Sequence, residues 1–147
     1  MFRRILIPTD GSKIARKAIK AGVALAKKLG AKVTAYYALE AVSPLVYGEG
    51  YIIDAATLQA FDQRARELGR KYVAEVEKAA RAAGVGCEVI VTKPATPAEG
   101  IIAAAKKTKC DVIFMASHGR GKLATLVLGS VTQKVLAHSK IPVLVFR

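Results

Sequence analysis

The chain has 147 residues, of which 52% are hydrophobic and 24% charged, and its formal net charge is +13. This length and composition are typical of one globular domain, so we expect residues 1–147 to form a single domain and exclude a disordered chain. No apolar run reaches the roughly 18 residues that a transmembrane helix needs, and the apolar stretch near the N-terminus is too short for a signal peptide. The sequence therefore predicts a cytoplasmic protein that does not use a membrane as its partner.

Apolar runs and helical patterns alternate along the chain. The apolar runs predict five strands, at about 3–8, 32–39, 87–92, 110–116 and 141–146. Amphipathic stretches predict four helices between them, at about 12–29, 55–83, 97–108 and 129–139. Gly30 and Gly84 stand where the first two helices end, and Thr96 with Pro97 forms an N-cap and a first helical residue. A loop at 40–54, which contains Gly and Pro, is long enough to be functional or mobile.

This alternation predicts an α/β fold, a single-domain doubly wound sheet of five parallel strands with four helices, because parallel strands need crossover connections. Ligands of such Rossmann-like sheets bind outside the carboxyl ends of the strands, where the strand order reverses. The segment PTDGS after the first strand and the loop after the fourth strand lie at such ends. We therefore expect a ligand site between these two loops.

Positive charge is concentrated on the first predicted helix. Between Ser12 and Leu29 there is no acidic residue, and the basic residues are Lys13, Arg16, Lys17, Lys20, Lys27 and Lys28. Apolar residues recur on the opposite side of the helix, so its outer face is cationic. Such a face is either an ordinary solvated surface or one that attracts polyanions. No aromatic residues interleave with the basic ones, as base stacking requires, so the pattern does not favour nucleic acid as the main partner.

The two cysteines indicate no redox or metal site. Cys87 and Cys110 form no CxxC pair, and neither has a histidine at metal-ligand spacing. Both fall in apolar, strand-like contexts. We expect free thiols that are buried or half-buried.

The stretch ASHGRGKLATLVLGS, residues 116–130, has the composition of a phosphate-binding loop. In the P-loop motif G-x-x-x-x-G-K-[ST], the first glycine and the final hydroxyl residue are replaced here by Ala116 and Leu123. The dinucleotide motif G-x-G-x-x-G also fails, because Ala124 stands in the third glycine's place and the stretch follows the fourth strand. The sequence excludes both motifs.

A phosphate site without either motif is still consistent with these residues. Gly119 and Gly121 allow tight turns and a close approach of the backbone to a ligand. A helix that begins at Gly129–Ser130 directs free N–H groups and the positive end of its dipole to the same place. Arg120 and Lys122 supply charge that screens phosphate. The residues alone leave a second interpretation open, in which the glycines only turn the chain and the serine is an ordinary N-cap.

The opening RRILIPTDGSKIARKAI and the closing VLGSVTQKVLAHSKIPVLVFR resemble the universal stress protein family, and the resemblance covers nearly the whole chain. The family's nucleotide-binding pattern is G-x-x-G-x9-G-[ST]. Here it reads Ala116-Ser117-His118-Gly119, nine residues, then Gly129-Ser130, so the spacing is kept and the first glycine is an alanine. The resemblance implies a fold of the adenine nucleotide alpha hydrolase type and ATP, alone or with Mg²⁺, as the ligand.

The resemblance also implies which residues hold the nucleotide. They are Pro8, Thr9, Asp10, Ala38, Ala116, His118, Gly119, Arg120, Gly129, Ser130 and Val131. Asp10 is expected to accept hydrogen bonds from the ribose or the adenine and to cap the following helix as well. Ala38 is expected to meet adenine through main-chain atoms. The methyl group of Ala116 is compatible with ATP if the backbone there is extended, but not if φ is positive or the methyl points at the phosphates.

The sequence shows no catalytic set. His118 lies near the expected phosphates but has no partner in the sequence to orient it, and His138 lies near a helix end where a cation is favourable. The resemblance implies at most slow ATP hydrolysis or autophosphorylation. We therefore predict a nucleotide-dependent regulator of the stress response.

The last strand, Ile141 to Phe146, is apolar and has no helix after it. At a sheet edge it offers unpaired backbone groups, and the resemblance implies a homodimer through this strand. In the alternative interpretation, Pro142 protects this edge from pairing with another chain.

Two other functions also stay open: an interaction module that has lost nucleotide binding, favoured by Ala116, and a binder of nucleic acid or an anionic surface through the basic face.

Overall fold

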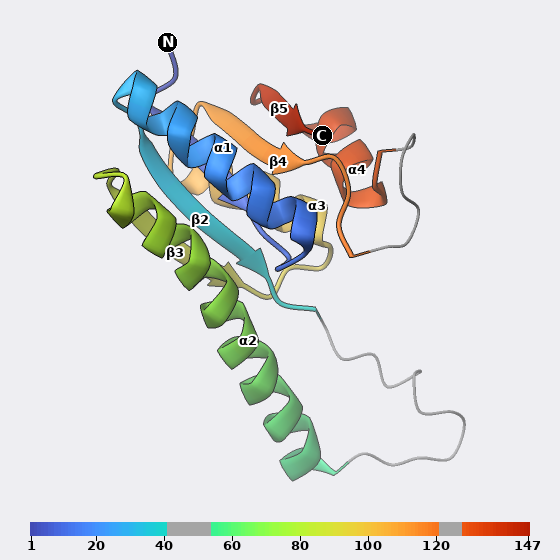
Figure 1. Ribbon diagram of the computed structural model, residues 1–147. Helices are drawn as coiled ribbons and strands as arrows, with labels where there is room; N and C mark the ends of the chain where they lie inside the picture. The colour runs from blue at the N-terminus through green and yellow to red at the C-terminus, as the bar shows by residue number, and fades with distance from the viewer. Residues whose placement is uncertain (41–53, 121–127) are drawn as a thin grey trace.

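A sheet of five parallel strands, in the order β3-β2-β1-β4-β5, forms the centre of the computed structural model, which describes residues 1–40, 54–120 and 128–147 (Figure 1). The strands are β1 (Arg4–Pro8), β2 (Lys32–Ala38), β3 (Cys87–Thr92), β4 (Val112–Ala116) and β5 (Val143–Phe146). β1 pairs with β2 on one side and with β4 on the other, so the strand order reverses at β1. The predicted α/β fold is confirmed, and so is the predicted reversal of the strand order.

Most of the predicted loop at 40–54, together with Gly121 and Lys122, lies outside the described residues.

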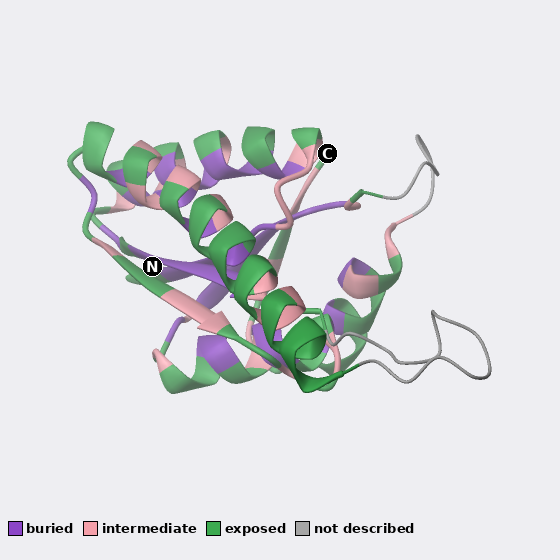
Figure 2. Ribbon diagram, turned by 90° about the horizontal axis from the view of Figure 1, so that it is seen from below, coloured by how far each residue is buried: buried purple, intermediate pink, exposed green. Residues whose placement is uncertain are grey.

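Helices cover both faces of the sheet. Within the described residues they are α1 (Lys13–Leu29), α2 (Ala55–Ala82), α3 (Pro97–Lys107) and α4 (Ser130–His138). α1 and α2 lie side by side on one face, and α3 and α4 lie together on the other (Figure 1). The strands at the centre are buried, and the helices show exposed residues on their outer sides (Figure 2). No described helix is long and apolar enough to cross a membrane.

The predicted helix ends are confirmed by the local geometry. The hydroxyl of Ser12 accepts a hydrogen bond from the backbone N–H of Ala15 at 3.2 Å and so begins α1. Gly30 ends this helix with a φ of 63°, a conformation that favours glycine. At α3 the hydroxyl of Thr96 accepts from the third residue of the first turn, and Pro97 is the first helical residue.

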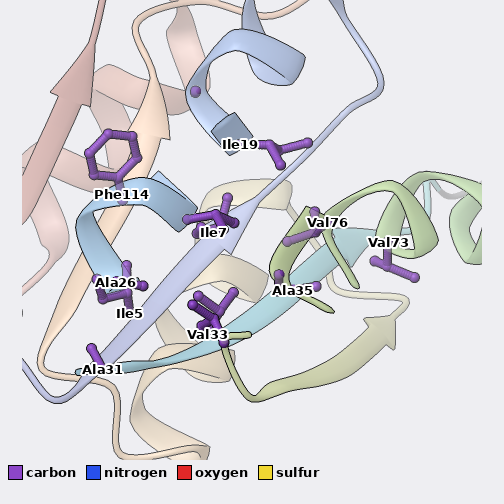
Figure 3. Close-up of a cluster of buried hydrophobic side chains, with 14 of the residues drawn as sticks. Ile5, Ile7, Ile19, Ala26, Ala31, Val33, Ala35, Val73, Val76 and Phe114 are labelled. Carbon is purple, nitrogen blue, oxygen red and sulfur yellow. The ribbon is translucent and has the colours of Figure 1, made fainter. Parts of the chain in front are cut away.

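The core consists of two apolar clusters, one on each face of the sheet. Side chains alternate along β1, so Ile5 and Ile7 face α1 and α2 while Leu6 faces α3 and α4. Figure 3 shows Ile5, Ile7 and Phe114 pointing into the space that Ile19 of α1 also enters. Each of these buried side chains contributes roughly 1.5–3 kcal/mol of burial free energy. This packing holds the carboxyl ends of the strands in place.

Both cysteines are free thiols, as the sequence predicts. Cys110 is buried, and its sulfur lies 3.5 Å from the hydroxyl of Thr34. Cys87 is partly buried, and burial raises the pKa of its thiol. A thiol with a raised pKa stays protonated and unreactive near neutral pH.

β5 begins two residues later than the apolar run that predicts it. The backbone N–H of Ile141 donates to the hydroxyl of Ser139 at 3.0 Å, which holds this segment in a turn. Pro142 has no N–H to give to the ladder, although its carbonyl accepts from the N–H of Ile113 at 2.9 Å. The strand therefore starts at Val143 and lies at one edge of the described sheet.

Candidate functional site

A cleft of about 430 Å³ opens at the carboxyl ends of β1, β2 and β4, beside the first turn of α4. Every residue that the sequence predicts for an ATP site lines it, from the segments 8–10, 116, 118–120 and 129–131 and from Ala38. These segments meet because β1 and β4 are neighbours at the point where the strand order reverses. The structure thus brings the predicted residues together, while their role in binding stays a prediction.

The cleft is also lined by residues that the sequence analysis does not assign to the site. They are Ala15, Tyr36, Tyr37, Glu40, Pro97, Ile101, Met115, Leu128 and Thr132. The sequence could have indicated two of these residues, because Tyr36 and Tyr37 directly precede Ala38 at the end of a predicted strand. Most of these side chains are apolar or aromatic, which is typical of the walls of small-molecule sites.

The loop after β1 carries a carboxylate into the cleft. Thr9 is buried, and its hydroxyl accepts from the N–H of Gly11 at 3.2 Å. Asp10 Oδ1 accepts from the backbone N–H of Ser12 at 2.9 Å. The expectation that Asp10 caps α1 is wrong, because Ser12 is the cap and the carboxylate holds the loop before it. No described residue donates a hydrogen bond to Asp10 Oδ2, which lies beside Gly119.

The glycines of the loop after β4 are required by close neighbours. A Cβ on Gly119 would collide with Asp10 Oδ2, so glycine lets the two loops approach each other. A Cβ on Gly129 would lie 3.0 Å from the Cα of His118. The N–H of Gly129 donates to the carbonyl of Ser117 at 2.8 Å and ties the two ends of this loop together. This amide is therefore already used inside the protein.

α4 begins at the cleft without a side-chain cap. Its N-cap is Gly129, which is extended and makes no side-chain capping hydrogen bond, and its first turn contains no acidic residue. The N–H groups of Ser130 and Val131 belong to the first turn, whose amides have no partner inside a helix. The hydroxyl of Thr132 donates to the carbonyl of Ala116 at 3.0 Å and fixes the helix to the end of β4. This arrangement suits an anion, because main-chain donors and the dipole act together.

Ala116 replaces the first motif glycine and lines the cleft. It is the last residue of β4 and pairs with Phe146 of β5. Within the described ranges, Lys109 is the only residue other than glycine with a positive φ, so the backbone at Ala116 is not left-handed. Its methyl group belongs to the apolar cluster under α1 that includes Phe114. A positive φ, the first of the two conditions that would exclude a ligand here, is therefore not met.

His118 has one partner that the sequence does not reveal. Its Nδ1 lies 3.0 Å from the hydroxyl of Ser117, which is buried. In the described part of the chain, no hydrogen bond or ion pair joins His118 to a carboxylate that would polarise it as a base. The same part of the chain has no group of three or more His, Cys, Asp or Glu side chains that could hold a metal ion.

Arg120 joins the two loops of the cleft. Its Nε donates to the carbonyl of Asp10 at 2.7 Å, and its guanidinium lies 5.1 Å from the ring centre of Tyr72 in α2. Tyr72 in turn packs against Tyr37, with ring centres 5.5 Å apart. Burial raises the pKa of the Tyr37 phenol, and the Arg120 guanidinium opposes part of that rise. Arg120 therefore fixes the loop geometry in addition to bringing a positive charge to the cleft.

The comparisons with known proteins agree with this geometry. The model of the universal stress protein family matches residues 1–147. The chain belongs to the universal stress protein family. A family member from Thermus aquaticus is 36% identical over all of both chains, and MJ0531 of Methanocaldococcus jannaschii is 32% identical over all of this chain and 83% of its own. The solved structure of MJ0577, from the same archaeon, has a TM-score of 0.82 at 27% identity and covers 99% of this chain and 95% of its own.

Proposed function

We propose that this universal stress protein binds ATP in the cleft and acts as a nucleotide-dependent regulator of the stress response. One observation carries the proposal: a carboxylate, an apolar and aromatic wall and an uncapped helix N-terminus converge on a single cleft. A nucleotide needs these three elements, for its ribose hydroxyls, its base and its phosphates.

Each part of the cleft has a role in this proposal. The base lies against the end of β2 at Ala38 and against the side chains of Ile101 and Met115. Asp10 Oδ2, which no described residue bonds, accepts from the ribose. The N–H groups of Ser130 and Val131 hold phosphate oxygens. Mg²⁺, when it accompanies ATP, is carried mainly by the phosphates, as is usual for this ion.

Other proteins of this fold support an adenine nucleotide as the ligand class. A universal stress protein solved in complex with cAMP has a TM-score of 0.65 at 22% identity. One from Archaeoglobus fulgidus, in complex with dAMP, has a TM-score of 0.65 at 16% identity. These likenesses concern the fold. The choice of a triphosphate rests on the uncapped helix and on the positive charge of Arg120 at the cleft.

The main alternative, an interaction module without nucleotide, rests on Ala116, and the extended, packed position of this residue supports nucleotide binding over it. Two other predictions stay untested. They are a cytoplasmic location and a homodimer through β5, which lies at the edge of the described sheet with Leu144 exposed.

Mass spectrometry of the purified and denatured protein tests the proposal first, because a bound nucleotide is released and identified by its mass. We expect ATP in near-stoichiometric amount, and ADP would indicate hydrolysis. On protein freed of nucleotide, calorimetry compares ATP, AMP and adenosine in the presence of Mg²⁺. We expect ATP to bind at least about tenfold more tightly than adenosine, because of the phosphate contacts. An empty protein with no heat of binding and no thermal shift would refute nucleotide binding.

A further inference from the structure

The outer side of α1 is a row of positive charges. All exposed residues of this helix except Ala24 are basic: Lys13, Arg16, Lys17, Lys20, Lys27 and Lys28. At 3.6 residues per turn these side chains fall within an arc of about 120°, and the helical rise spreads them over about 22 Å. α1 lies in front of the sheet in Figure 1, and no described element crosses its outer side. The row is therefore open to a large partner.

Most of this charge has no ion-pair partner among the described residues. Arg16 pairs with Glu75 of α2, through two hydrogen bonds of 2.9 and 3.2 Å. Over the described ranges, none of the five lysines forms an ion pair. The first turn of α1 has no acidic residue, so Lys13 stands at the positive end of the helix dipole, where a cation is unfavourable. An external anion would relieve this repulsion.

A second hollow, of about 570 Å³, lies at the N-terminal end of the row. Lys13 and Lys17 line it from α1, and His118 and Arg120 line it from the loop after β4. The row of lysines thus ends at a hollow that several cationic side chains line. One phosphate group can be held there by more than one donor.

We infer that this α1 basic face (Lys13, Lys17, Lys20, Lys27, Lys28 and the hollow) binds the sugar-phosphate backbone of double-stranded nucleic acid. Along the axis of a duplex, a row about 22 Å long corresponds to about six phosphates of each strand, at 3.4 Å of axis per phosphate. The absence of exposed aromatic residues among the described residues of α1 argues against single strands, which bind by stacking, but a duplex backbone needs no stacking.

The same face does not suit the other partners of a basic helix. An interfacial membrane helix inserts large apolar side chains, and a protein interface is centred on buried aromatic or Arg anchors. Ala24 is the only exposed apolar residue of α1. Asn and Gln, which read adenine edges, do not occur in this helix, and its one arginine is paired with Glu75. Binding is therefore expected to depend on the backbone and to show no sequence preference.

Two matched triple variants test the inference. Lys17→Gln, Lys20→Gln and Lys27→Gln together remove three charges from the face, while Lys106→Gln, Lys107→Gln and Lys134→Gln remove three from exposed positions of α3 and α4 on the other side of the sheet. Gln and Lys have similar helix propensities, so both variants are expected to fold, which circular dichroism checks. Fluorescence anisotropy measures binding of a labelled DNA duplex of about 20 base pairs, from about 50 to 200 mM salt, the range in which phosphate contacts weaken.

We expect the wild-type protein to bind two unrelated duplex sequences equally. The face variant should lose at least about tenfold in affinity at low salt, and its salt slope should shrink by about 2 to 3, near 0.9 for each lost contact. The control variant should stay within about twofold of the wild type. Equal losses in both variants would overturn the inference, because they would show attraction to net charge alone. Lack of duplex binding at low salt, or face-dependent binding only to vesicles that contain phosphatidylserine, would also overturn it. Nucleotide binding is measured separately and does not enter either result.

Discussion

α1 and α4 both begin near the carboxyl ends of the strands, where the cleft lies, but their first turns differ. α1 starts with Ser12, whose hydroxyl accepts from the N–H of Ala15 at 3.2 Å. α4 starts with Gly129, which offers no side-chain acceptor. Asp54 and Thr96 cap α2 and α3 as Ser12 caps α1, so α4 is the one described helix without a side-chain cap. At α1 the chain satisfies a first-turn amide with its own side chain, and at α4, where it does not, we propose that a ligand completes the helix start.

The lack of a capping side chain has a small cost for the stability of α4. A Ser or Asp cap typically stabilises a helix by about 1 kcal/mol over a residue without a capping side chain, though glycine itself is only a few tenths worse than the best caps. α4 has nine residues, so its first turn is a large part of it. Since glycine costs so little as an N-cap, the first-turn amides of α4 stay open at the cleft with little loss of stability.

The largest effect is expected for Gly129→Asp, which gives α4 a cap. The new carboxylate accepts the first-turn amides and places negative charge where the phosphates are proposed to bind, so ATP affinity should fall about a hundredfold or more. Gly129→Ala is the matched control, since its Cβ also lies 3.0 Å from His118 Cα but carries no charge, and we expect a loss of about tenfold or less. Calorimetry measures both. Equal losses would mean that crowding against His118, and not the cap, controls binding.

A smaller effect is expected for Gly119→Ala. The new methyl collides with the Asp10 carboxylate and pushes the two loops apart, and such overpacking costs about 1–3 kcal/mol. ATP affinity should therefore fall between about fivefold and a hundredfold, measured by calorimetry. Gly86→Ala is the control, because its nearest neighbour would be a Lys32 side-chain carbon at 3.7 Å, and it should change affinity by less than about twofold. Unchanged affinity in Gly119→Ala would show that the contact between the loops does not shape the site.

Ser12→Ala tests the structural role of the α1 start. Loss of the hydroxyl leaves the Ala15 amide without its partner and should lower the free energy of unfolding by about 1 kcal/mol, measured by urea denaturation. ATP affinity should stay within about threefold, because the proposed phosphate donors belong to α4. A tenfold loss of affinity at unchanged stability would place the phosphates at α1 instead.

The smallest effect on affinity is expected for Ala116→Gly, which restores the family's motif. The methyl group packs in the apolar cluster under α1, so we expect ATP affinity to change by less than about threefold. The free energy of unfolding should fall by about 1 kcal/mol, from the lost burial and the added chain entropy. If calorimetry found much tighter binding, the alanine would be an obstruction after all.

Sequence reasoning succeeds for this fold where the chemistry is local. The alternation of strands and helices predicts the parallel sheet, and Gly30, Thr96 and Pro97 act within one turn of their own positions. The capping role of Asp10 was wrong because Asp10 and Ser12 both have suitable side-chain oxygens near the start of α1. Only the path of the backbone decides between them.

The parts of the site that the sequence does not reveal depend on contacts between distant segments. Tyr72 of α2 packs on Arg120, and this contact exists only because α2 covers the sheet beside α1. The neighbour that requires glycine at position 119 is Asp10, more than a hundred residues away. The amide of Gly129, an expected phosphate donor, is already bonded to Ser117. No pattern in one stretch of sequence contains such information.

The most direct test of the account compares the two helix starts in one experiment. Amide NMR spectra of the ¹⁵N-labelled protein, freed of nucleotide, are recorded during titration with ATP and Mg²⁺. The account predicts that the N–H signals of Ser130 and Val131 shift strongly, while those of Lys13 and Ile14, the first two residues of α1, move little. Adenosine, which has no phosphate, should leave the α4 signals nearly unchanged. Large shifts at α1 with none at α4 would contradict the claim that the uncapped helix holds the phosphates.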